Sequence, residues 1–84
     1  MQQLVVHGIY RHYKGDYYII EDIARHTETG EELVIYRGLY ADGPLWARPK
    51  AMFLEEIEPN QIPPDQPQQQ HRFEFQHIKS TAKH

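Results

Sequence analysis

One run of residues, 32–40 (Glu-Leu-Val-Ile-Tyr-Arg-Gly-Leu-Tyr), restricts the fold of this chain more than any other. It is rich in β-branched and aromatic residues and has a turn signal at each end, which predicts a β-strand. Apolar side chains alternate onto both of its faces, so we expect this strand in the middle of a small, curved sheet. Gly38 interrupts the run and predicts a bend, a bulge or a close approach to the backbone.

Further strands are predicted on either side of this run. Four segments have the alternation or the β-rich composition of short strands: residues 9–13, 17–26, 45–48 and 72–75. Glu21 and Asp22 break the alternation of the second segment and predict either a bulge or a bend in the strand. Residues 50–55 favour a single helical turn directly after Pro49. We therefore expect a mainly all-β fold, a small SH3-like barrel of about five strands with one helical turn.

The chain, at 84 residues, is short enough to form only one domain. We expect residues 1–58 to form the barrel core and residues 59–70 to be a flexible segment. A last strand is expected in residues 71–78 and a frayed tail in residues 79–84. Flexibility is predicted because residues 59–70 contain four of the six prolines, five glutamines and Ile62 as their only large apolar side chain.

Composition excludes several classes of protein. The chain has no cysteine, so disulfides, thiolate metal sites and a cysteine nucleophile are excluded. The first residues lack a signal-peptide pattern, and no segment approaches the ~20 apolar residues that span a bilayer. We therefore expect a cytoplasmic protein without a membrane partner. A formal net charge of −3 argues against a general nucleic-acid binder.

Catalytic and metal-binding patterns are weak in this sequence. Six histidines are present, but none of their spacings is that of a zinc-ligand pair, so we expect no metal and no cofactor. Ser80 is the only serine and lies in the predicted tail, which argues against a Ser-His-Asp site. A barrel this small also has little interior for a catalytic cleft. An enzyme is therefore the less favoured interpretation.

Basic and aromatic residues form the candidate ligand-binding set: Arg11, His12, Arg25, His26, Tyr36, Arg37, Trp46 and Arg48. If Arg11, Arg25 and Arg37 project from one face, they form a cationic stripe able to hold a phosphate or a carboxylate. Neighbouring rings would then stack a base, a sugar or a proline. In the competing interpretation, which the many acidic residues favour, each arginine pairs with an acidic neighbour across strands.

The one tryptophan, Trp46, is also expected to stabilise the core. We expect Trp46 to be largely buried against Phe53 and a tyrosine of the 32–40 strand, because a short strand needs such an anchor. On that interpretation, replacing Trp46 with alanine removes about 3–5 kcal/mol of stability.

Four blocks of sequence also carry a resemblance in their order and spacing. They are Tyr-Arg-His-Tyr-Lys-Gly (10–15), Ala-Arg-His-Thr-Glu-Thr (24–29), Glu-Leu-Val-Ile-Tyr-Arg (32–37) and Leu-Trp-Ala-Arg-Pro-Lys-Ala-Met-Phe-Leu-Glu (45–55). From residue 8 to residue 57 the chain resembles the small bacterial family catalogued as domain of unknown function 1653. The resemblance implies an SH3-type barrel and a bacterial, soluble protein, and it implies no activity. The Arg72-Phe73 pair also resembles that family, but here a Pro/Gln-rich insertion precedes it.

Three functional hypotheses remain. The first is a binding module that recognises an anionic or extended partner, an unknown protein, peptide or nucleic acid, through the basic and aromatic face. The second is a small enzyme or enzyme subunit in which Arg48, His26 and Glu28 form a polar site at one end of the barrel. The third is a structural or homodimeric assembly domain. A groove lined by Tyr and Trp would favour the first, a buried His–Glu–Arg set the second, and a large two-fold apolar contact the third.

Overall fold

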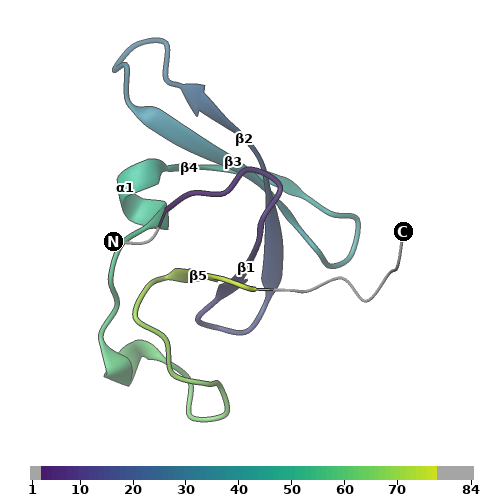
Figure 1. The fold of residues 1–84 in the computed structure, drawn as a ribbon, viewed down its shortest axis with the longest axis vertical. Coiled ribbons are helices and arrows are strands. Elements are labelled where there is room, and N and C mark those ends of the chain that lie inside the picture. Colours follow the sequence, from purple (N-terminus) through teal and green to yellow (C-terminus); the bar gives the residue numbers. More distant parts are fainter. Residues whose placement is uncertain (1–2, 78–84) are drawn as a thin grey trace.

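A computed structural model describes residues 3–77 of the chain. Five strands form one antiparallel sheet in the order β4-β3-β2-β1-β5: β1 (Ile9–His12), β2 (Tyr17–Arg25), β3 (Glu32–Gly38), β4 (Leu45–Pro49) and β5 (Phe73–Phe75) (Figure 1). One helical turn, α1 (Lys50–Phe53), follows β4, and a 3₁₀ turn spans Pro59–Gln61. The prediction of a mainly β, SH3-like fold with five strands and one helical turn is confirmed. No helix within residues 3–77 is long and apolar enough to cross a membrane.

The central strand is β2, which pairs with β1 on one side and β3 on the other. Its register against β3 shifts between Ile20 and Asp22, so of the two predicted alternatives the structure has the bulge. The run 32–40, which contains β3, was expected in the middle of the sheet. That prediction is wrong by one strand, because β2 is the middle strand and β3 lies next to it. The reason is that β5 adds to the far side of β1, where Tyr10 pairs with Phe75, and so moves the middle to β2.

The core is mostly aromatic. Phe53 and Phe73 lie at its centre with their rings stacked, 4.1 Å between centroids and 4° between planes. Tyr10 packs edge-on against Phe53 at 5.4 Å. Phe53 is the buried residue of α1, so this turn, too short to be stable alone, is held by the ring that it delivers to the core.

The predicted burial of Trp46 is wrong, because 47% of this residue is exposed. It lies on β4, which among residues 3–77 is an edge strand with a neighbouring strand on one side only. The central place expected for it is taken by the stacked rings of Phe53 and Phe73. We therefore expect Trp46→Ala to leave the domain folded.

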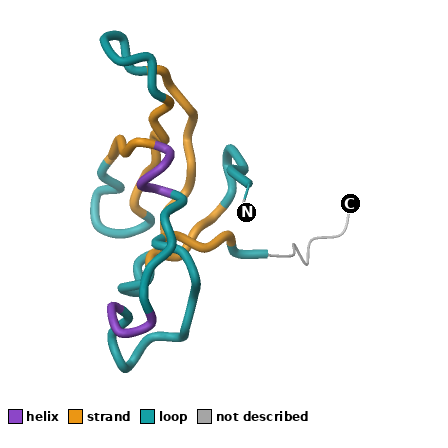
Figure 2. Tube along the Cα trace, turned by 90° about the vertical axis from the view of Figure 1, so that its left-hand side faces the viewer, coloured by secondary structure: helices purple, strands orange, loops and turns teal. Residues whose placement is uncertain are grey.

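Residues 59–70 return along the lower part of the molecule, at the opposite end from the β2–β3 hairpin (Figure 2). Ile62 from this segment is buried with Tyr13 and Ile57 in a second, smaller apolar cluster. These contacts attach the segment to the barrel, and its predicted flexibility stays a prediction. The expected last strand is present as β5, whereas the predicted tail, residues 79–84, lies outside the described residues.

Candidate functional site

Side chains from all five strands converge on one small cavity, which we call the aromatic pocket. Its volume is about 180 Å³ and its lining residues are His12, Tyr18, Tyr36, Tyr40, Trp46, Arg48 and Phe73. The two edge strands of the sheet, β4 and β5, both contribute to it. The structure therefore brings together four of the eight predicted site residues: His12, Tyr36, Trp46 and Arg48.

Tyr18 links the aromatic walls of the pocket. Its ring makes edge contacts with Tyr36 at 5.4 Å, Phe73 at 5.5 Å and Tyr40 at 5.6 Å. Its hydroxyl lies 3.4 Å from the hydroxyl of Tyr40. Burial and this neighbouring hydroxyl raise the pKa of Tyr18, so the phenol stays protonated and able to donate a hydrogen bond.

Gly38 makes room for the ring of Tyr40, which lines the aromatic pocket. A Cβ atom at this position would lie 2.5 Å from the ring of Tyr40, far closer than real Cβ contacts. The missing side chain thus lets the Tyr40 ring lie over the backbone next to Tyr18. This is the close approach that the sequence predicted as one of three options for Gly38.

Arg48 supplies the positive charge of the pocket. Its Nε donates a hydrogen bond to the hydroxyl of Tyr36 at 3.1 Å, and its guanidinium lies 5.9 Å from the ring centre of Phe73. These contacts fix the plane of the guanidinium. Within residues 3–77 no hydrogen bond is described for its two terminal nitrogens, so both can donate to a ligand.

His12 lines the pocket as a neutral ring. Its Nδ1 accepts a hydrogen bond from the backbone N–H of Lys14 at 3.1 Å, which leaves Nε2 as the protonated nitrogen. The ring stacks on Tyr13 with centroids 4.4 Å apart. Burial lowers the pKa of His12 to about 4, and the nearby charges of Arg72, Lys14 and Arg48 act in the same direction.

Acid should therefore destabilise the domain through His12. Its folded-state pKa lies below the ordinary value of 6.5, so the unfolded chain binds more protons between these two values and stability falls as the pH falls. From about pH 7 to about pH 5 we expect a loss of at most about 2 kcal/mol. Urea unfolding at both pH values measures it. A His12→Gln variant should lose most of this pH dependence, and an unchanged dependence in that variant would contradict the assignment.

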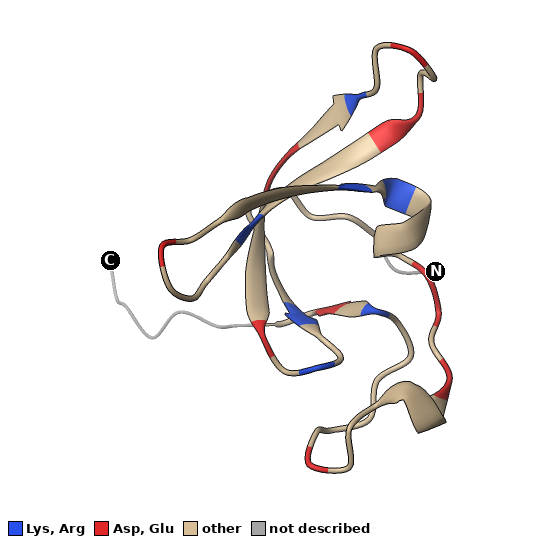
Figure 3. Cartoon of the chain, turned by 180° about the vertical axis from the view of Figure 1, so that it is seen from behind, with Lys and Arg blue, Asp and Glu red and all other residues tan. Residues whose placement is uncertain are grey.

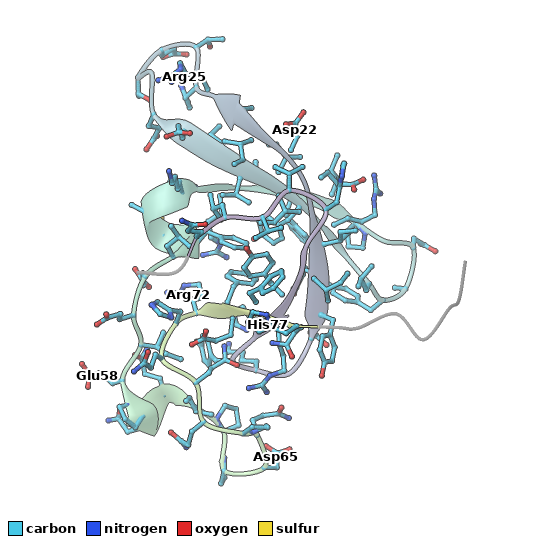
Figure 4. All side chains as sticks on the ribbon, in the orientation of Figure 1. Asp22, Arg25, Glu58, Asp65, Arg72 and His77 are labelled. Carbon is cyan, nitrogen blue, oxygen red and sulfur yellow. The ribbon has the colours of Figure 1, made fainter. Side chains whose placement is uncertain are left out.

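The three arginines of the predicted stripe bind three different parts of the chain. Arg25 lies near the tip of the β2–β3 hairpin (Figure 4), where its Nη1 donates to the carbonyl of Gly30 at 2.7 Å. Arg37 forms an ion pair with Glu21 at 3.2 Å, which agrees with the competing interpretation of cross-strand pairing.

Arg11 is 8% exposed and is held by the Pro/Gln-rich segment. Its guanidinium donates to the carbonyl of Pro67 and to the side-chain oxygens of Gln66 and Gln69. In return, the Gln69 amide donates to the backbone carbonyl of Arg11 at 3.1 Å. Arg11 is thus a structural residue that attaches a distant segment to β1.

His26 does not line the aromatic pocket. Its Nδ1 accepts hydrogen bonds from the backbone N–H groups of Glu28 and Thr29, at 3.1 and 3.3 Å, within the β2–β3 turn. The proposed polar set of Arg48, His26 and Glu28 is therefore divided between the pocket and the hairpin turn. Within residues 3–77 no group of three or more imidazole or carboxylate side chains is placed to hold a metal ion.

Three lining residues, Tyr18, Tyr40 and Phe73, were not in the predicted site. Tyr40 had a usable signal, since it follows the glycine that accommodates its ring. Tyr18 is predicted on the same strand face as Ile20, as an ordinary core residue would be. Phe73 reaches the pocket because β5, about sixty residues further along the chain, pairs with β1 and places Phe73 opposite His12.

Comparisons with known proteins agree with this fold. A family described as a protein of unknown function, DUF1653, matches residues 8–75, which include every residue of the aromatic pocket. The crystal structure of a protein belonging to DUF1653 from Bordetella bronchiseptica is similar over 95% of this chain and 97% of that one. Its TM-score is 0.70 and its sequence identity 35%. No curated protein matches the chain. The resemblance seen in the sequence is thus confirmed: the chain belongs to the DUF1653 family.

Proposed function

We propose that this protein is a binding module whose aromatic pocket receives one side chain of an extended peptide. The observation that carries the proposal is the pocket itself, in which five aromatic rings and a neutral histidine surround an arginine with two available nitrogens. At about 180 Å³ it is smaller than sites for drug-sized ligands, which occupy roughly 300–1,000 Å³. A cavity of this size suits a single side chain of a larger partner.

The rim of the pocket supports a protein partner. Trp46 and Tyr40 line the cavity and are also exposed, and Leu39 and Leu45 are exposed beside them in sequence. Exposed aromatic and aliphatic side chains around a small pocket are typical of protein-binding surfaces. Aromatic-lined grooves on SH3 domains bind extended, proline-rich segments in a comparable manner.

Charge favours a peptide over a nucleic acid. Figure 3 shows basic and acidic positions interleaved along the chain. Ion pairs occupy Arg37, Lys50 and Arg72, with Glu21, Glu32 and Glu55 as their partners. A nucleic-acid binder neutralises several phosphates at once, and the pocket offers one arginine.

The same proposal includes a bacterial cytoplasmic location. The similar crystal structure comes from a bacterium. A chain without cysteine also gains no disulfide from an oxidising compartment. Catalysis has less support, because the candidate polar residues His26 and Arg48 are separated.

Selection of short random peptides displayed on phage tests the proposed function. We expect the protein to enrich peptides whose affinity falls about tenfold or more in Trp46→Ala and in Arg48→Gln, since each change removes a pocket contact. Calorimetry with the synthetic peptides measures the change, and thermal unfolding shows that each variant remains folded.

Matched controls are available elsewhere on the surface. Tyr17 is 45% exposed, close to Trp46, and does not line the aromatic pocket, so Tyr17→Ala should leave affinity unchanged. Arg25→Gln removes a charge at the hairpin and serves as the control for Arg48→Gln. Peptides that bind equally well to all four variants would overturn the proposal. So would binding of single-stranded oligothymidine in a Trp46-dependent manner without any selected peptide.

A further inference from the structure

We infer that the peptide binds as an added β-strand along the outer edge of β4 and places an acidic side chain against Arg48. The inference rests on the proposed function and names the geometry and the chemistry of the partner. Two observations carry it. Within residues 3–77, β4 has backbone groups on its outer edge without a strand partner, and the terminal nitrogens of Arg48 beside that strand have no hydrogen bond.

The hydrogen-bond register shows which groups of β4 face outward. The N–H of Gly38 donates to the carbonyl of Pro44 at 3.0 Å, which makes these two residues a hydrogen-bonded pair. Bonded and non-bonded pairs alternate in an antiparallel ladder. Trp46 and Arg48, two and four residues beyond Pro44, therefore direct their N–H and C=O groups toward β3.

Leu45 and Ala47 direct their backbone groups the other way, toward the open edge. Both residues are exposed, and within residues 3–77 β4 has no strand neighbour on that side. Their two N–H and two C=O groups form a short template for an incoming strand. Pro49 has the same outward register but no N–H, so the template ends there.

The side chains of an added strand would alternate between the face of the aromatic pocket and the opposite face. Successive residues of a strand point to opposite faces, so Trp46 and Arg48 share the face that carries Tyr36. Both line the aromatic pocket with Tyr36. A peptide residue beside them on that face would enter the pocket, and its neighbours would lie on the opposite face next to exposed Leu45.

Charge selects an acidic side chain for the pocket. The two terminal nitrogens of Arg48 match the two oxygens of one carboxylate, and the protonated Nε2 of His12 is a further donor. Lys14 and Arg72 add positive charge near His12, with Asp16 as the opposing acid. The expected partner therefore alternates an acidic residue, which enters the pocket, with apolar residues, which lie over Leu45.

Backbone methylation of a selected peptide separates strand addition from pocket binding. N-methylation of the peptide amide that faces β4 should weaken binding about tenfold, because one ladder hydrogen bond is lost. Methylation of the next amide, which faces solvent, should change affinity less than about twofold. Replacing the peptide's acidic residue by its amide should weaken binding to the wild type about tenfold and have little further effect in Arg48→Gln.

A substitution in the protein gives a second, independent reading. Ala47→Pro removes one outward N–H and leaves the β3–β4 ladder intact, since that N–H does not face β3. We expect about tenfold weaker peptide binding with an unchanged melting temperature. Should Ala47→Pro fail to fold, the methylated peptides still test strand addition on the wild-type protein.

The outcomes are distinguishable. Peptides that depend on Trp46 and Arg48 but tolerate methylation at both amides would overturn the inference and leave the proposed function standing. An absence of any peptide that depends on Trp46 or Arg48 would overturn both. Sedimentation that shows a dimer of the protein alone, abolished by Ala47→Pro, would make a second copy the occupant of the edge and so overturn the inference as well.

Discussion

Replacing Phe53 with alanine should leave the domain unfolded or barely stable. Phe53 is fully buried, stacks on Phe73 at 4.1 Å and makes edge contacts with Tyr10 and Tyr36, both at 5.4 Å. Loss of such a ring removes about 3–5 kcal/mol through lost burial and the cavity left behind. Domains of this size have total stabilities at the low end of about 5–15 kcal/mol. Urea unfolding followed by circular dichroism measures the loss.

Met52, the preceding residue of the same helical turn, provides the control. It is exposed, so Met52→Ala should change the free energy of unfolding by no more than about 0.5 kcal/mol. If Phe53→Ala unfolds at the same urea concentration as Met52→Ala, the core has been placed wrongly.

Arg11→Ala should cost about 3 kcal/mol and release the Pro/Gln-rich segment. The change leaves the carbonyl of Pro67 and the side-chain oxygens of Gln66 and Gln69 without their charged donor. Hydrogen bonds to charged groups are worth about 1.5–3 kcal/mol each, and those lost here are not independent. Urea unfolding measures the loss, and limited proteolysis should show faster cutting within residues 59–70 than in the wild type.

Two further variants test whether the guanidinium of Arg11 causes the expected loss of stability. Arg11→Lys keeps the charge but lacks the planar set of donors, so its stability should fall between those of Arg11→Ala and the wild type. Arg25→Ala, at an exposed arginine, should lie within about 0.5 kcal/mol of the wild type. Equal cutting rates in Arg11→Ala and the wild type would show that Arg11 does not hold the segment.

Local sequence patterns predicted the strands and turns well. The β-rich runs and the glycine turns around them are sufficient to identify five short strands, because each strand reflects the residues within it. Gly38 predicted a bend, a bulge or a close approach, and the third of these is present, since the ring of Tyr40 lies against it. The number of short strands and the helical turn predicted the barrel, and the family resemblance agreed with it.

The contacts that could not be predicted are those between residues far apart in the sequence. Arg11 resembled a surface cation, because nothing in residues 9–13 indicates that glutamines more than fifty positions away bind it. Trp46 resembled a core anchor, because its exposure follows from the place of β4 at the sheet edge. Four of the eight predicted site residues line the pocket, and the contacts of the arginines explain why the others do not. Arg11 and Arg25 donate to backbone oxygens that the sequence did not indicate, whereas the ion pair of Arg37 with Glu21 follows the predicted cross-strand pairing.

The pairing of β5 with β1 also sets the order in which the domain can assemble. Tyr10 and Phe75 are partners although sixty-five positions separate them, whereas the β2–β3 and β3–β4 hairpins close over short turns. Distant pairings of this kind slow folding, so we expect refolding in milliseconds to seconds, measurable by stopped-flow fluorescence of the one tryptophan. Until β5 arrives, Phe53 lacks the ring that covers it, and the nascent chain exposes an aromatic surface on which other chains can aggregate.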